Sequence, residues 1–300
     1  MDQRSSSSAV EGGLSEPLTS HESTNLLLPE GNREGASAIM APSLQAETVT
    51  LATAQQVAGA VAHFLSLAVL LVVSIWVFDE GMGGGGLSWK KGDAKRVFNW
   101  HPLLMITAFS FMTVASLAFR PSIPRISTFM ARSTKKLLHG IEWTVAALSA
   151  TVGLVAVVQS HNDAASGFIA NLYSLHSWVG VFVIAMYLSQ FAVGTCAFAL
   201  DIPSIFTPAV KANVVMVHRF VGQFVYNLTA ATILLGIQEK EGFIGCNYTV
   251  TKADTFPIQH FFDIPKVCRI GHFIGILVVL TTLCTNFALY SFEKAPHRNR

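Results

Sequence analysis

Six long apolar runs constrain this chain more than any other feature of its sequence. Each is long enough to cross the hydrocarbon core of a bilayer as a helix, and together they cover about residues 55–78, 99–119, 137–159, 173–198, 213–237 and 270–292. Inside a membrane every backbone N–H and C=O group needs a partner within the protein, and helices supply those partners internally. The sequence therefore predicts an all-α integral membrane protein with six transmembrane helices.

The composition agrees with a membrane protein. Hydrophobic residues make up 51% of the 300 residues and charged residues only 13%, which is not the balance of a soluble protein. The net charge of +2 gives no basis for binding nucleic acid. We expect three parts: a disordered cytosolic tail at 1–54, a transmembrane domain at 55–292 surrounded by lipid, and a short cytosolic tail at 293–300.

The first tail is rich in Ser, Glu and Gly, and no apolar region follows a basic start, so we expect no cleaved signal peptide. Glu22 followed by Leu26 and Leu27 resembles an acidic dileucine sorting address. Such an address predicts an endolysosomal or vesicle membrane. A few leucines in a loose tail explain the pattern equally well, and the plasma membrane stays the alternative.

A glycine-rich connection at 79–98 includes Gly81-Met82-Gly83-Gly84-Gly85-Gly86, which matches the letters of the G-x-G-x-x-G dinucleotide pattern. It follows no predicted strand and opens no βαβ unit, so a dinucleotide site is rejected. The composition predicts a flexible loop instead.

The short connections predict the orientation of the helices. The connection at 120–136 carries five basic residues and no acidic one, whereas the connection at 160–172 carries Asp163 and no Lys or Arg. Basic loops stay on the cytosolic side, so 120–136 and both termini are predicted to be cytosolic. Basic residues at 90–96, on the predicted outer side, argue against this orientation.

The long connection at 238–269 supports that orientation. It contains the sequon Asn247-Tyr248-Thr249, so Asn247 is a candidate glycosylation site on the non-cytosolic side. The same connection contains Cys246 and Cys268, and an oxidising compartment would allow them to form a disulfide.

Four histidines are predicted to form two pairs within the bundle of the second to fifth helices. His101 and His176 lie near the outer starts of the second and fourth helices. His139 and His218 lie near the cytosolic starts of the third and fifth helices. Ionisable side chains are rare inside membranes and are functional candidates when they occur.

Two histidines at each level fit axial ligands of a six-coordinate haem iron on facing helices. Zinc prefers four ligands, and the apolar helices offer few others, the main exception being Glu142. A proton relay through the paired histidines is the alternative function, and histidines that only satisfy local packing are the structural alternative.

Several motifs around these histidines resemble the cytochrome b561 family, with the animal duodenal and lysosomal ferric reductases the most similar. The resemblance spans about residues 55–292, and the segments that carry it are Phe98-Asn99-Trp100-His101-Pro102-Leu103-Leu104-Met105, Lys136-Leu137-Leu138-His139-Gly140, His161-Asn162, Tyr173-Ser174-Leu175-His176-Ser177-Trp178-Val179-Gly180 and Gly236-Ile237-Gln238-Glu239-Lys240. The resemblance implies two non-covalent haem b groups and a homodimer. It implies electron transfer from cytosolic ascorbate to monodehydroascorbate or a ferric chelate. A non-redox transporter of protons or metal is the alternative function.

The basic residues near the cytosolic histidines are candidates for binding ascorbate. Arg132, Lys136 and His139 are spaced i, i+4, i+7 and share one helical face, and Lys211 and His218 repeat the seven-residue interval. The resembling family places its ascorbate-contacting cations at similar positions. Basic residues are also expected at any cytosolic helix end, which is the alternative explanation.

On the outer side the resemblance implies that His161, Asn162 and Tyr173 line the acceptor site. The connection from His161 to His176 is a few residues longer than the family pattern, and polar loop residues are common in any case. His63, His260 and His272 have no role in the family pattern.

Overall fold

In a computed structural model of the protein, the described residues are 33–120, 130–200, 202–246, 261 and 264–290. Within these ranges the chain is helical and contains no strand. Its elements are α1 (Arg33–Phe78), the 3₁₀ turn η2 (Glu80–Met82), α2 (Ala94–Phe98), α3 (Trp100–Leu117), α5 (Arg132–His161), α6 (Leu175–Gly194), the π-helical turn η3 (Thr195–Ala199), α7 (Pro208–Phe243) and α8 (Lys266–Leu289).

Six of the described segments are long and apolar enough to cross a membrane. They are Leu51–Phe78, Ala94–Leu117, Arg132–His161, Leu175–Ala199, Pro208–Phe243 and Lys266–Leu289. The predicted fold class, six transmembrane helices, is therefore confirmed. The fifth helix is longer than the predicted run, because its ends carry polar residues that hydropathy alone does not count.

The chain divides into two compact units, residues 1–48 and 49–300. The described part of the first unit, residues 33–48, is helical and forms the beginning of α1. The sequence predicted a helix only from about residue 55. The additional stretch is rich in Ala, which favours helices by propensity, and it shows no apolar period that would predict a helix.

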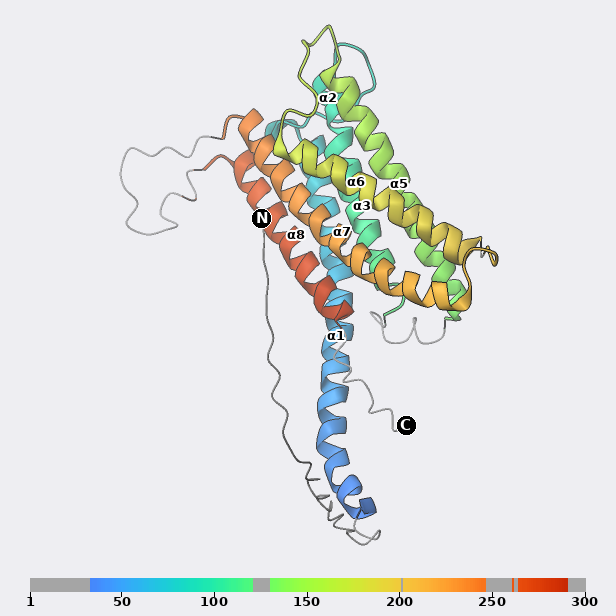
Figure 1. The fold of residues 1–300 in the computed structure, drawn as a ribbon. Coiled ribbons are helices and arrows are strands. Elements are labelled where there is room, and N and C mark those ends of the chain that lie inside the picture. Colours follow the sequence, from blue (N-terminus) through green and yellow to red (C-terminus); the bar gives the residue numbers. More distant parts are fainter. Residues whose placement is uncertain (1–32, 121–129, 201, 247–260, 262–263, 291–300) are drawn as a thin grey trace, which may run out of the picture. The chain divides into compact units, whose positions relative to one another are not determined.

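The second unit is a helical bundle in which neighbours along the chain pack as antiparallel pairs (Figure 1). α3 packs most extensively against α5, and α6 packs against α7, which also contacts α8. Close packing and hydrogen bonds hold helices together within a membrane, where the hydrophobic effect between them is weak. The α3–α5 and α6–α7 pairs carry the four histidines.

A buried aromatic and polar cluster occupies the middle of this bundle. Phe109 of α3 stacks on Tyr226 of α7 with ring centroids 5.3 Å apart, and both side chains are fully buried. The Tyr226 hydroxyl lies 2.9 Å from the Thr113 hydroxyl and 3.1 Å from that of Thr285 in α8. These hydrogen bonds link α3, α7 and α8 across the centre of the unit.

The glycine-rich connection after α1 is closely packed. A Cβ atom on Gly84 would collide with the backbone carbonyls of Trp76 and Val77. The buried Asn99 side chain donates hydrogen bonds to the carbonyls of Gly84 (3.0 Å) and Gly86 (2.8 Å). The predicted flexible loop is therefore corrected to a loop fixed against the end of α1. Glycine permits this close approach because it has no side chain.

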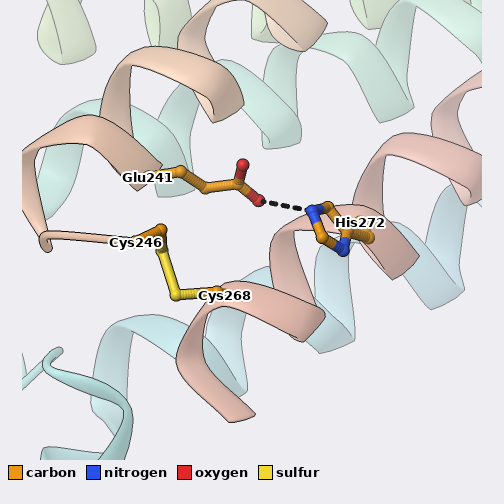
Figure 2. The surroundings of a disulfide bond; sticks show 4 residues. All are labelled: Glu241, Cys246, Cys268 and His272. Carbon is orange, nitrogen blue, oxygen red and sulfur yellow. Dashed lines mark ion pairs between the residues drawn. A yellow bond between two sulfur atoms is a disulfide. The ribbon is translucent and has the colours of Figure 1, made fainter. Parts of the chain in front are cut away.

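A disulfide joins the end of α7 to the start of α8 (Figure 2). It links Cys246 to Cys268, and we call this end of the bundle the disulfide end. Beside it, Glu241 of α7 and His272 of α8 form an ion pair at 3.6 Å. Asn247 and His260 lie outside the described residues, as do Glu22, Leu26 and Leu27 of the first tail.

Replacing Cys246 and Cys268 together by Ser should destabilise the α7–α8 connection, because a disulfide that closes a loop of this length contributes about 2–4 kcal/mol. Thermal unfolding of the detergent-solubilised protein measures the loss. Non-reducing peptide mapping should show the two cysteines linked. The free cysteines Cys196 and Cys284 provide the control, since their Ser variants should keep the linked peptide. Alkylation of both Cys246 and Cys268 in freshly isolated protein would contradict the prediction.

Candidate functional site

The structure places the four histidines in two facing pairs, the pairs that the helix topology predicted. The His101 ring of α3 lies 6.0 Å from that of His176 in α6, measured between ring centroids. The His139 ring of α5 lies 6.3 Å from that of His218 in α7. Each pair therefore joins one helix of the α3–α5 pair to one helix of the α6–α7 pair.

The direction of each helix determines which end of the bundle its histidine lies near. His101 and His176 are the second residues of α3 and α6, which both begin at the disulfide end. The Ser174 side chain caps α6 by accepting a hydrogen bond from the Ser177 backbone N–H. His139 and His218 lie in the first few turns of α5 and α7, which begin at the opposite end. Antiparallel packing therefore gives one histidine pair near each end of the bundle.

Three of the histidines are oriented by hydrogen bonds from their Nδ1 atoms to backbone carbonyls. His101 donates to Gly153 (3.1 Å), His139 to Ala115 (2.8 Å) and His176 to Thr232 (2.9 Å). Because a carbonyl only accepts, the proton lies on Nδ1, and Nε2 keeps the lone pair that binds a metal. This is the arrangement found around most metal-binding histidines.

His218 differs, since its Nδ1 is buried and has no hydrogen-bond partner among the described residues. Glycine makes room for its ring: a Cβ on Gly194 of α6 would lie 3.3 Å from His218 Cε1. Gly236 of α7 does the same for His176, where a Cβ would lie 2.7 Å from Cε1. Side chains at these two glycines would displace the imidazoles.

A cavity of about 450 Å³ opens between α3, α5, α6 and α7 at the disulfide end. His101 and His176 both line it. Its deeper wall is apolar and includes Met105, Ile184 and Tyr187. Its polar end is lined by His161, Asn171, Tyr173, Glu239 and Lys240. A cavity of this size suits a small-molecule cofactor with an apolar body and a polar edge.

The histidine pairs fit a haem iron. Two imidazoles that share one metal atom at about 2 Å each hold their ring centres about 6 Å apart, which agrees with both pairs. The free Nε2 atoms, the glycine clearances and the cavity agree with a haem between facing helices. Among the described residues, no three His, Cys, Asp or Glu side chains gather into a metal site.

A hydrogen-bonded group forms the polar end of the cavity. The Tyr173 hydroxyl donates to Glu239 Oε1, and the Ser174 hydroxyl donates to Glu239 Oε2 at 2.8 Å. Desolvation and the hydrogen bond to Glu239 raise the pKa of Tyr173 above its usual value. Tyr173 therefore stays protonated at physiological pH and acts as a hydrogen-bond donor.

The predicted residues His161 and Tyr173 come together here, with ring centroids 6.2 Å apart. The Nδ1 atom of His161 is buried and has no partner in the described part of the chain. Asn162 caps the end of α5 by donating to the Val158 carbonyl (2.8 Å), and it is not part of the cavity wall. Asn171, whose side chain lies 3.5 Å from that of Asn162, lines the cavity.

The predicted basic residues lie at the opposite end of the bundle. Arg132 begins α5, Lys136 lies one turn later, and both are exposed. Lys211 lies in the first turn of α7 and is partly buried. All three precede a histidine of the second pair on the same helix, so they lie between that pair and the end of the bundle.

Sequence reasoning did not assign roles to Gly236, Glu239, Lys240 or Asn171. One segment that carried the family resemblance contains Gly236, Glu239 and Lys240. An acidic residue next to a basic one at the end of an apolar run could have indicated a functional role for Glu239 and Lys240. Asn171 was not detectable, because its place depends on the fold of the 162–174 connection.

The model of the eukaryotic cytochrome b561 family matches residues 100–244, which include all four histidines. The chain is 34% identical over 184 residues to the probable ascorbate-specific transmembrane electron transporter 2 of Oryza sativa subsp. japonica, covering 61% of this chain and 72% of that protein. It is 36% identical over 187 residues to the plasma membrane ascorbate-dependent reductase CYBRD1 of Rattus norvegicus, covering 60% and 58%. It is 31% identical over 184 residues to the transmembrane ascorbate ferrireductase 1 of Arabidopsis thaliana, covering 61% and 71%. The chain belongs to the cytochrome b561 family.

Proposed function

We propose that the protein is an ascorbate-dependent oxidoreductase that carries single electrons across a membrane through two haem b groups. The observation that supports this most is the pair of histidine levels at opposite ends of one bundle, each with the spacing of two axial ligands. The names of the relatives, which include an ascorbate-specific electron transporter and ascorbate-dependent reductases, support the same reaction class.

The separation of the two levels suits this function. The hydrocarbon core is about 30 Å thick, too far for a single electron transfer between partners in water on its two sides. His101 and the Ala115 carbonyl, which orients His139, are fourteen residues apart on α3, so the levels lie about 20 Å apart at 1.5 Å per residue. Bound haem supplies a centre that takes up and releases one electron. His101, His176, His139 and His218 hold these centres at set depths, and the apolar helices exclude water.

The donor end is the end that carries Arg132, Lys136 and Lys211. Ascorbate is an anion at neutral pH, and these cations attract it and favour loss of its proton as it is oxidised. The basic 120–136 connection assigns this end to the cytosol, with both termini on the same side.

The acceptor end is the disulfide end. The Nδ1 atom of His161, which has no partner among the described residues, can hydrogen-bond to an acceptor at the cavity mouth, and the Tyr173 hydroxyl, whose proton is donated to Glu239, can accept a hydrogen bond there. Asn162 fixes the end of α5 beside them. The acceptor is monodehydroascorbate or a ferric chelate, and the name of the Arabidopsis relative, a ferrireductase, supports iron. This end faces the cell exterior or an endolysosomal lumen, where Asn247 would be glycosylated. We also propose that the protein acts as a homodimer.

Visible absorption of the purified protein tests the proposal directly. A haem protein with two histidine ligands shows sharp bands on reduction, and ascorbate alone should produce them. A colourless protein would contradict the proposal and would favour the alternative, a transporter that moves protons or metal through the histidines.

Replacing single histidines by Ala should remove one haem of two, because each pair shares one iron. His101→Ala and His176→Ala should lose the same haem, and His139→Ala and His218→Ala the other. Haem stoichiometry and the remaining absorption spectrum of each variant measure this. His63→Ala in α1 is the control and should keep both haems. Loss of one shared haem in the His101 and His139 variants would show that the pairing is wrong.

Replacing Lys136 and Lys211 together by Gln should slow reduction by ascorbate by up to about tenfold, because each largely exposed ion pair with the anion contributes roughly 0.2–1 kcal/mol. Reduction by dithionite should be unchanged, since the haem ligands are intact. Stopped-flow absorption with both reductants measures the two rates. Lys135→Gln is the matched control, because Lys135 is one residue off the face shared by Arg132, Lys136 and His139. Equal slowing with both reductants would indicate a structural role.

A further inference from the structure

A partly buried lysine of α7 lines the cavity that contains His101 and His176. Lys240 lies in the last turn of α7, and its Nζ atom lies 4.9 Å from the centre of the Phe98 ring. The ammonium group is therefore directed over α2 at the polar end of the cavity. A cation–π contact of this kind compensates only part of the hydration that the ammonium loses.

The acidic residues on either side of Lys240 are committed to other partners. Both carboxylate oxygens of Glu239 accept hydrogen bonds, from Tyr173 and from Ser174. Glu241 pairs with His272 of α8 beside the disulfide (Figure 2). No acidic side chain of the described segments forms an ion pair with Lys240.

An unpaired cation in a low-dielectric cavity is costly unless the occupant of the cavity supplies a negative charge. Haem b carries two propionate carboxylates on one edge of an otherwise apolar ring. The cavity has one polar end, and Lys240 is the cation among the described residues that line this end. The buried Nδ1 atom of His161 is a further atom there that can form a hydrogen bond. The propionate edge of a bound haem would therefore fit this end, since the deeper wall is apolar.

We infer that Lys240 is the counter-ion of a propionate of the haem held by His101 and His176. This inference rests on the proposed function, because it requires that haem. Lys240 positions the haem edge and lowers the energy of the reduced form, which carries one more negative charge than the oxidised form. The haem at the acceptor end is thereby made easier to reduce, while the haem at the His139–His218 level, about 20 Å away, is affected little.

The experiment compares full-length Lys240→Gln, Lys240→Arg and Lys95→Gln with the wild type. Lys240→Gln should shift the propionate bending mode in the resonance Raman spectrum. It should lower the midpoint potential of one haem only, and speed release of that haem to apomyoglobin about tenfold, the effect of losing one charge-assisted hydrogen bond. Lys240→Arg should restore all three properties, because it keeps the charge. Lys95→Gln should resemble the wild type, since Lys95 is exposed on α2.

Unchanged Raman modes, potentials and haem release in Lys240→Gln would overturn the inference. So would a variant whose only change is a raised KM for an anionic ferric chelate, since Lys240 would then bind the acceptor. If Lys240→Gln binds neither haem, the Lys240→Arg variant decides the question. A wild-type Raman spectrum and wild-type potentials in Lys240→Arg support a charge pair. Loss of haem in Lys240→Arg as well contradicts a charge pair. Wild-type protein without haem bands would contradict the proposed function, and the inference with it.

Discussion

The hydrogen bonds from three histidine Nδ1 atoms to helix carbonyls are the interaction on which the candidate site depends, because they orient the rings. His101 of α3 donates to Gly153 of α5, and His139 of α5 donates to Ala115 of α3. Each helix of this tightly packed pair therefore orients the histidine of the other. In the α6–α7 pair, His176 donates to Thr232. Three of the four histidines are therefore oriented by hydrogen bonds within their own helix pair, and His218 is the exception.

This arrangement separates two tasks that compete inside a membrane. Packing within each helix pair needs close contact, and binding a planar cofactor between the pairs needs open space. Gly236 and Gly194 contribute to the second task, because their missing Cβ atoms leave room for the rings of His176 and His218. The middle of the bundle is closed instead by the stack of Phe109 on Tyr226, and the Tyr226 hydroxyl bridges three helices through Thr113 and Thr285.

The two ends of the bundle differ in chemistry. At one end the charged residues are basic and largely exposed, an arrangement that suits a soluble anion arriving from water. At the disulfide end exposed basic residues of α2 are joined by two partly buried charged side chains, with Glu239 held by Tyr173 and Ser174, and Lys240 directed into the cavity. Exposed charges suit a diffusing donor, and the partly buried Glu239 and Lys240 suit control of a bound cofactor.

The six helices, the family and the choice of four histidines were predictable from the sequence alone. Apolar run length and helix direction are local properties, and helix direction is enough to sort His101, His176, His139 and His218 into two levels. The tertiary structure decided which atoms complete each site. Asn162 and Asn171 are close in the chain, yet the fold of their connection places only Asn171 on the cavity wall. Glu239 and Lys240 are neighbours, yet the helix rotation directs one to Tyr173 and the other to Phe98. Those contacts depend on how helices pack against one another, so they cannot be predicted from the residue pattern along a single helix.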